Sequence, residues 1–162
     1  MFLFNNPNII KEMKTIIDAD GHILGRLATY VAKRALLGDE IIVVNAEKAI
    51  ISGRKEMVFR QHLDKLKIRN KGNYRKGPFH QKRPDKLVRR AIRGMLNHRE
   101  YRGRQACERV MVYISVPDGE IEKKHGIKVK DVQKLDDLKK RVDNFVTVGD
   151  VCRFIGGKWI GS

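Results

Sequence analysis

The chain has 162 residues, of which 41% are hydrophobic, and this fits one globular domain with a single core. No apolar run approaches the ~18 residues of a membrane-spanning helix, which excludes an integral helical membrane protein. The formal net charge of +16 is large enough for the chain to repel itself, and it indicates a polyanionic partner.

The charge excess lies in the middle third of the chain. Residues 54–110 carry 19 cations and 5 acids, whereas residues 1–53 carry six of each and residues 111–162 carry 10 cations and 8 acids. Such clustering is typical of a nucleic-acid-binding surface. The five histidines and two cysteines show no metal-ligand spacing, so neither a metal nor a cofactor is expected. Cys107 and Cys152 predict reduced, buried thiols.

The first half of the chain predicts strands that alternate with a helix. Residues 15–18, 41–44 and 49–52 are rich in isoleucine and valine and indicate strands. Residues 25–37 show apolar side chains at helical spacing, and Gly38 follows as a stop signal. A strand, a helix and a strand in this order predict a βαβ unit and a parallel sheet.

The middle of the chain predicts two helices that flank an exposed basic loop. Residues 54–67 favour a helix, and residues 68–83 form the loop because glycine, asparagine and cations dominate there. The next helix begins at Pro84, a residue that the first helical turn tolerates. One side of this helix is apolar, through Leu87, Val88, Ala91, Ile92, Met95 and Leu96. The other side is cationic, through Lys86, Arg89, Arg90 and Arg93.

The C-terminal part predicts a strand, an extended segment at residues 145–147 and two further helices. One more turn is expected near residues 103–108, and a strand follows at 110–114. The apolar residues of 120–143 recur every third position and predict an amphipathic helical extension. Thr147 and Asp150 resemble a capping box that starts the last helix. Residues 13–162 are thus expected to form one domain, preceded by a leader, residues 1–12, of unknown role.

Three sets of residues suggest catalysis but are better explained otherwise. Asp18 and Asp20 resemble a phosphotransferase pair, although a turn accounts for them more simply. The sequence FIGGK lacks the glycine and the hydroxyl residue of a phosphate-binding loop. His80 and His98 flank the basic helix and leave a nuclease open as an alternative, beside RNA binding or a purely surface role.

Three aromatic residues lie among cations and are candidates for base stacking: Tyr74, Phe79 and Tyr101. Aromatic rings in basic surroundings stack on unpaired bases. For Phe79 a place in the core is an equally good interpretation.

Two long stretches carry a resemblance to a known family. They are IIDADGHILGRLATYVAKRALLGDEIIVVNAEKAIISG, residues 16–53, and GPFHQKRPDKLVRRAIRGMLNHREYRGRQACERVMVY, residues 77–113. In order and spacing they resemble the L-thirteen family of large-subunit ribosomal proteins, in its archaeal and eukaryotic-like form. The C-terminal VTVGDVCRFIGGKW is similar to the archaeal tail more loosely.

The resemblance implies an α/β fold, a three-layer sandwich around a four-stranded parallel sheet, with long basic loops and a C-terminal helical extension. It implies a cytoplasmic, non-enzymatic constituent of the large ribosomal subunit that binds large-subunit rRNA and supports subunit assembly. Its partners would be this rRNA and neighbouring ribosomal proteins, with no membrane and no small-molecule substrate. A regulatory binder of a messenger RNA hairpin remains a further alternative.

The resemblance also implies which residues contact rRNA. They are Lys82, Arg83, Lys86, Arg89, Arg90, Arg93, Arg99, Arg102 and Arg104. Charge alone adds Lys71, Arg75 and Lys76 from the preceding loop. We expect these side chains to bind mainly phosphates and RNA shape, because base edges are seldom accessible in folded RNA helices.

Overall fold

The computed structural model describes residues 14–126, 132–133, 135, 139 and 142–159. The leader therefore lies outside the described residues. The elements in chain order are β1 (Lys14–Asp18), α1 (Leu24–Leu37), β2 (Glu40–Val44), η1 (Ala46–Lys48), β3 (Ile50–Ser52), α2 (Lys55–Lys67), η2 (Tyr74–Lys76), α3 (Pro84–Gly94), α4 (Tyr101–Glu108), β4 (Val110–Val112), α5 (Asp118–His125), β5 (Val132–Gln133), β6 (Phe145–Thr147) and α6 (Val148–Phe154).

The main sheet has the strand order β4-β2-β1-β5, and all its pairs are parallel. β1 pairs with β2 over its whole length, with Ile16 opposite Ile42, and α1 connects the two strands. β5 adds only two residue pairs at the other edge of β1. The predicted βαβ unit and the α/β class are confirmed. The three-layer detail of the expectation stays a prediction.

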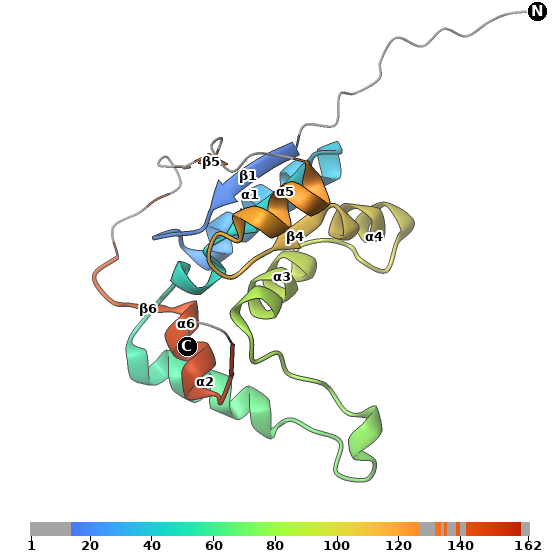
Figure 1. The fold of residues 1–162 in the computed structure, drawn as a ribbon. Helices are drawn as coiled ribbons and strands as arrows, with labels where there is room; N and C mark the ends of the chain where they lie inside the picture. Colours follow the sequence, from blue (N-terminus) through green and yellow to red (C-terminus); the bar gives the residue numbers. More distant parts are fainter. Residues whose placement is uncertain (1–13, 127–131, 134, 136–138, 140–141, 160–162) are drawn as a thin grey trace, which may run out of the picture.

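The two faces of the sheet pack against different helices. Ile17, Ile41 and Val43 belong to the main core, which they share with the buried residues of α1, α3 and α4. Ile16, Ile42 and Val44 form a second cluster with Ile121 of α5. Because successive side chains of a strand point to opposite faces, the continuous run Ile41–Val44 is buried on both sides. Figure 1 shows α1 and α5 on either side of the strands.

The strand predicted at residues 49–52 does not belong to the parallel sheet. β3 pairs instead with β6, antiparallel, in a separate two-stranded sheet. Only residues 45–49 separate β2 from β3. A parallel neighbour needs a crossover of about a dozen residues or more, so this connection is too short. A sheet of the strands 15–18, 41–44, 49–52 and 110–114 was expected. The expectation was wrong for the strand at 49–52.

The single amphipathic helix predicted over residues 120–143 is also wrong. α5 ends at His125, because Gly126 adopts a left-handed conformation with φ 68° and its N–H donates to Glu122 O. Val132 then lies in a strand, opposite Ile16. Glycine at this position is a helix stop signal that the three-residue apolar spacing obscured. Residues 127–131, 134, 136–138 and 140–141 lie outside the described part of the chain.

α2 and α6 lie together, apart from the main sheet (Figure 1). The rings of Phe59 and Phe154 stack with centroids 4.2 Å apart and join the two helices. α6 begins as predicted, since Thr147 Oγ1 accepts a hydrogen bond from Asp150 N at 3.0 Å. No helix in the described residues is both long enough and apolar enough to cross a membrane.

Candidate nucleic-acid interface

α3 is the two-sided helix that the sequence predicts. Pro84 occupies its first turn, and Val88 and Ile92 are 0% and 1% exposed in the core. Leu96, just beyond the end of the helix, is also buried, at 4% exposure. Met95 is different, because the helix ends at Gly94 and the Met95 side chain is 45% exposed. Placing Met95 on the buried face was therefore wrong. Burial of the other apolar side fixes the helix in rotation, so its opposite side must face outward.

The outward side carries four exposed cations: Lys86, Arg89, Arg90 and Arg93. They line a hollow of about 390 Å³ together with Gln81 and Cys107, which we call the cationic hollow. Within the described residues, none of the four forms an ion pair with a carboxylate. Their charge is therefore not neutralised by these acids.

Backbone carbonyls orient two of these guanidinium groups. Arg90 Nη1 donates to Phe79 O at 3.0 Å, and Arg89 Nη2 lies 3.5 Å from Cys107 O. An arginine has five N–H donors, so each group keeps donors for an incoming anion. A planar guanidinium held in this way is suited to bridging two phosphate oxygens.

The basic loop between α2 and α3 extends away from the sheet (Figure 1) and is held by its own hydrogen bonds. His80 Nε2 lies 2.8 Å from Ile68 O and joins the two ends of the loop. Asn70 Oδ1 accepts from Gly72 N and Asn73 N, both at 3.0 Å. The contacts predicted from charge alone, Lys71, Arg75 and Lys76, lie in this loop, and all three are exposed.

Lys82 and Arg83 are the last two residues of this loop, immediately before α3. Both are exposed, but Arg83 Nε lies 3.2 Å from Asp85 Oδ1. An RNA phosphate would therefore compete with Asp85 for Arg83. The carbonyl of Lys82 packs directly against Gly157.

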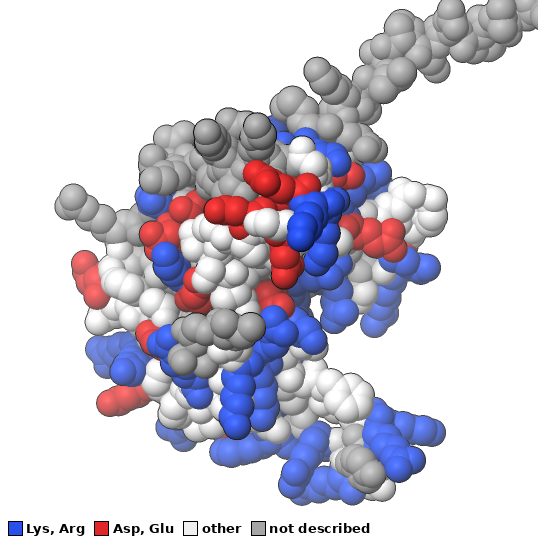
Figure 2. All heavy atoms as spheres, viewed as in Figure 1, with Lys and Arg blue, Asp and Glu red and all other residues white. Residues whose placement is uncertain are grey.

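Three arginines follow α3, and all are exposed: Arg99, Arg102 and Arg104. Arg104 Nη2 donates to Arg99 O at 3.3 Å across the start of α4. The turn predicted at 103–108 is a helix that already begins at Tyr101. In Figure 2, Lys and Arg side chains gather over α4, the η2 loop and α2, whereas Asp and Glu gather around α5.

The aromatic candidates are exposed where the structure describes them. Phe79 is 68% exposed and Tyr101 is 74% exposed, so the alternative that Phe79 belongs to the core is wrong. Tyr101 OH accepts from Gln105 Nε2 at 2.6 Å. The side chain of Tyr74 lies outside the described part of the structure. Stacking on bases stays a prediction.

The cations of α2 are not among the predicted contacts. Val58 is the buried residue of this helix, and most of its other side chains face solvent, including Lys65 and Lys67. Lys65 lines a hollow between α2 and α3 that Arg90 also lines. The excess of cations over acids in residues 54–67 is the sequence signal that would have indicated them.

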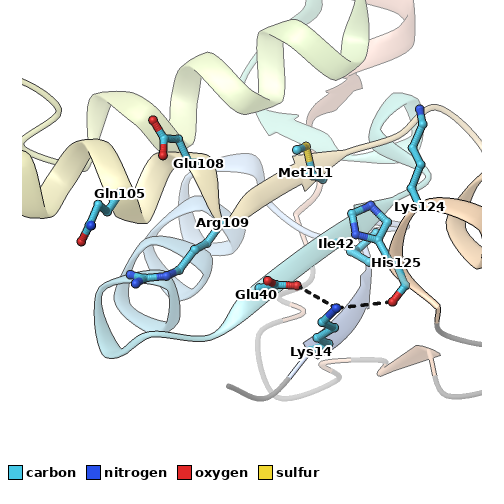
Figure 3. A pocket seen from close by; sticks show the side chains of 9 residues that line it. All are labelled: Lys14, Glu40, Ile42, Gln105, Glu108, Arg109, Met111, Lys124 and His125. Carbon is cyan, nitrogen blue, oxygen red and sulfur yellow. Dashed lines mark hydrogen bonds and ion pairs between the residues drawn. The ribbon is translucent and has the colours of Figure 1, made fainter. Parts of the chain in front are cut away.

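A different hollow lies at the amino ends of the sheet strands (Figure 3). It has a volume of about 420 Å³ and is lined by both signs of charge, including Glu40 and Glu108 beside Arg109. Lys14 Nζ is engaged there by Glu40 Oε2 at 3.3 Å and by His125 O at 3.4 Å. Mixed charge of this kind does not favour a phosphate backbone, in contrast to the cationic hollow.

Among the residues of the catalytic alternatives, Asp18 and His80 have structural roles, whereas His98 is exposed. Asp18 Oδ1 accepts from Asp20 N at 3.0 Å and from Asn45 Nδ2 at 2.8 Å, as a turn requires. His80 is held by Ile68 O. The described residues contain no cluster of three or more metal-ligating side chains.

Both cysteines are free thiols. Cys152 is buried as predicted, and burial, with a smaller effect of Asp85, raises its pKa to about 12. Cys107 is only half-buried, so the prediction of burial was wrong for it. A thiol with a raised pKa stays protonated and is a poor nucleophile.

Comparison with known proteins gives a consistent result. Residues 12–118 match the family described as Ribosomal protein L13. The chain is 42% identical over 155 residues to large ribosomal subunit protein uL13 of Archaeoglobus fulgidus, covering 94% of this chain and 96% of the relative. It is 39% identical to the protein of the same name from Methanococcoides burtonii, covering 90% and 99%. It is 41% identical to that of Thermoplasma acidophilum, covering 88% and 98%.

Proposed function

Because the chain belongs to the ribosomal protein L13 family, a family of structural ribosomal proteins and not of enzymes, we propose that it binds large-subunit rRNA. In this proposal residues 13–162 form one rRNA-binding domain. The domain works in the cytoplasm, supports assembly of the large subunit and lies beside other proteins of that subunit.

One observation carries the proposal: α3 presents four exposed cations that no described carboxylate neutralises. The core fixes the helix, and the cationic hollow brings Lys86, Arg89, Arg90 and Arg93 to one place. Phosphate oxygens are the ligands that suit such a cluster, because each is anionic and accepts several hydrogen bonds. The loop of residues 68–83 and the arginines after α3 extend the same kind of surface on either side.

The proposal predicts that replacing Arg89, Arg90 and Arg93 together by alanine weakens binding to large-subunit rRNA. Filter binding at several salt concentrations is the measurement. The log–log slope of affinity against salt should become shallower by about 2 to 3, from ~0.7 to 0.9 per lost phosphate contact. The melting temperature should remain close to that of the wild type, because all three side chains are exposed.

The matched control removes three cations elsewhere: Lys33 on α1 and Lys123 and Lys124 on α5, all exposed. This variant has the same net charge as the α3 variant. It should bind rRNA nearly as well as the wild type. Equal loss in both variants would mean that total charge, not the α3 surface, determines binding.

Sedimentation distinguishes a ribosomal constituent from a regulator of messenger RNA. In a sucrose gradient of cell extract, the tagged full-length chain should travel with large subunits and whole ribosomes. Recovery only in light messenger fractions would contradict the proposal.

A further inference from the structure

A second hollow adjoins the cationic hollow and is different in character. It lies between α2 and α3 and has a volume of about 640 Å³. We call it the apolar hollow. Its apolar lining includes Ile51, Leu66, Leu87 and Ala91, which are only partly buried. No acidic residue is among the described residues that line it. It therefore offers apolar surface to a ligand without repelling an anion.

Polar groups at this hollow have unused hydrogen-bonding capacity. His62 Nδ1 is paired with Val58 O at 2.8 Å, and His80 Nε2 with Ile68 O at 2.8 Å. Because carbonyl oxygens accept, these nitrogens donate, and in the neutral rings the other nitrogen is an acceptor. The amides of Gln61 and Gln81 add donors and acceptors that no described residue pairs.

The two hollows are connected through shared residues. Gln81 and Arg90 line both of them. One site thus combines a partly apolar recess with hydrogen-bonding groups, and a cluster of cations immediately beside it. A nucleotide has the same two parts, a flat base with a polar edge and an adjoining phosphate.

We infer that the apolar hollow receives an unpaired base of rRNA while the cationic hollow binds the phosphate backbone next to it. This inference rests on the proposed rRNA binding and adds a base-specific contact to it. The base packs on Leu66, Leu87 and Ala91, and its edge meets the free nitrogens and amides described above. Single-stranded bases in loops and bulges are accessible to such recesses, unlike bases in RNA helices. An acidic protein segment suits the site less well. Its carboxylates could form ion pairs only at the cationic hollow, and not along the apolar lining.

The test probes base edges in the complex of full-length protein with large-subunit rRNA. Dimethyl sulfate and a carbodiimide together report the Watson–Crick edges of all four bases. The wild type should protect at least one unpaired base. Leu66→Trp fills the hollow without changing charge, and this base should regain its reactivity even at saturating protein. Affinity should fall roughly tenfold, as expected for loss of one packed base, while the salt slope stays unchanged.

Leu63→Trp is the matched control, because Leu63 lies on the same helix, is 38% exposed and does not line the hollow. It should leave the protection in place. Thermal unfolding verifies that both variants fold. Should Leu66→Trp fail to fold, Gln81→Leu replaces it, and the same base should become reactive there as well.

The outcomes separate the inference from the proposed function. If the wild type binds rRNA with a steep salt dependence but protects no unpaired base, the inference is wrong and the proposed function stands. Protection that persists in Leu66→Trp also overturns the inference. The apolar hollow would then be a contact site for a neighbouring protein. If the wild type does not bind rRNA, the proposed function itself fails.

Discussion

Gly157 brings the C-terminal segment against the residues that lead into α3. Its N–H donates to Cys152 O at 2.8 Å. A Cβ atom at this position would collide with the carbonyl of Lys82 and would lie 2.8 Å from Cys152 O. Both obstacles are backbone atoms, which cannot move aside as a flexible side chain would. Only glycine permits this close approach.

We therefore expect Gly157→Ala to reduce the free energy of unfolding by about 1 to 3 kcal/mol, the usual cost of a forced backbone shift. Urea denaturation followed by circular dichroism is the measurement. The control is Gly119→Ala, because a Cβ there meets nothing within 4 Å. That control should be neutral or slightly stabilising. An unchanged free energy of unfolding in Gly157→Ala would show that the backbone at Lys82 can shift at little cost.

At the scale of the element, the loop of residues 68–83 is a preformed projection. Its ends are joined by His80 and Ile68, and Asn70 replaces the missing backbone partners of Gly72 N and Asn73 N. Asparagine side chains stabilise turns in this way. A preformed loop loses less conformational entropy on binding RNA than an unstructured one.

Asn70→Ala removes both turn hydrogen bonds without removing a charge. We expect rRNA affinity to fall a few-fold, from a cost of ~1 kcal/mol for the lost bonds, while the melting temperature stays the same because the loop is outside the core. Filter binding and thermal unfolding provide the two readouts. Asn144→Ala, an exposed asparagine without a described side-chain partner, is the control. Unchanged rRNA affinity in Asn70→Ala would indicate that the loop takes up its structure only when RNA binds.

For the molecule as a whole, the division of charge between regions is the dominant property. Nineteen cations against five acids lie in residues 54–110, and the sheet-forming parts before it are balanced. The acids of α5 are on a separate part of the surface (Figure 2). The domain thus has one strongly basic region, and the field of this region attracts a polyanion in one orientation.

Binding of the wild type to large-subunit rRNA should weaken steeply with salt. If about six phosphates are neutralised, the log–log slope is about −4 to −5. Filter binding between low and moderate salt concentrations gives this slope directly. A flat response would contradict a phosphate-dominated interface, whatever the affinity at one salt concentration.

Local patterns in the sequence were sufficient for α3 and for the βαβ unit. The periodicity that buries Val88 and Ile92 also exposes Arg89 and Arg93, because both pairs belong to one rigid helix. The cap at Thr147 was likewise readable, since its partner is three residues away. These features depend on residues a few positions apart, and the sequence alone shows which residues those are.

Only the tertiary structure decided which distant segments meet. It paired β3 with β6 and not with β2, and it placed β5 where a helix was expected. It also brought α2 beside α3, so that Leu66 and Arg90 line one hollow. The physical reason is that strand pairing and helix packing depend on contacts between residues far apart in the chain. Composition and periodicity do not identify which residues make these contacts. The sequence by itself determined what each segment is and where the charge lies, and the fold determined what those charges surround.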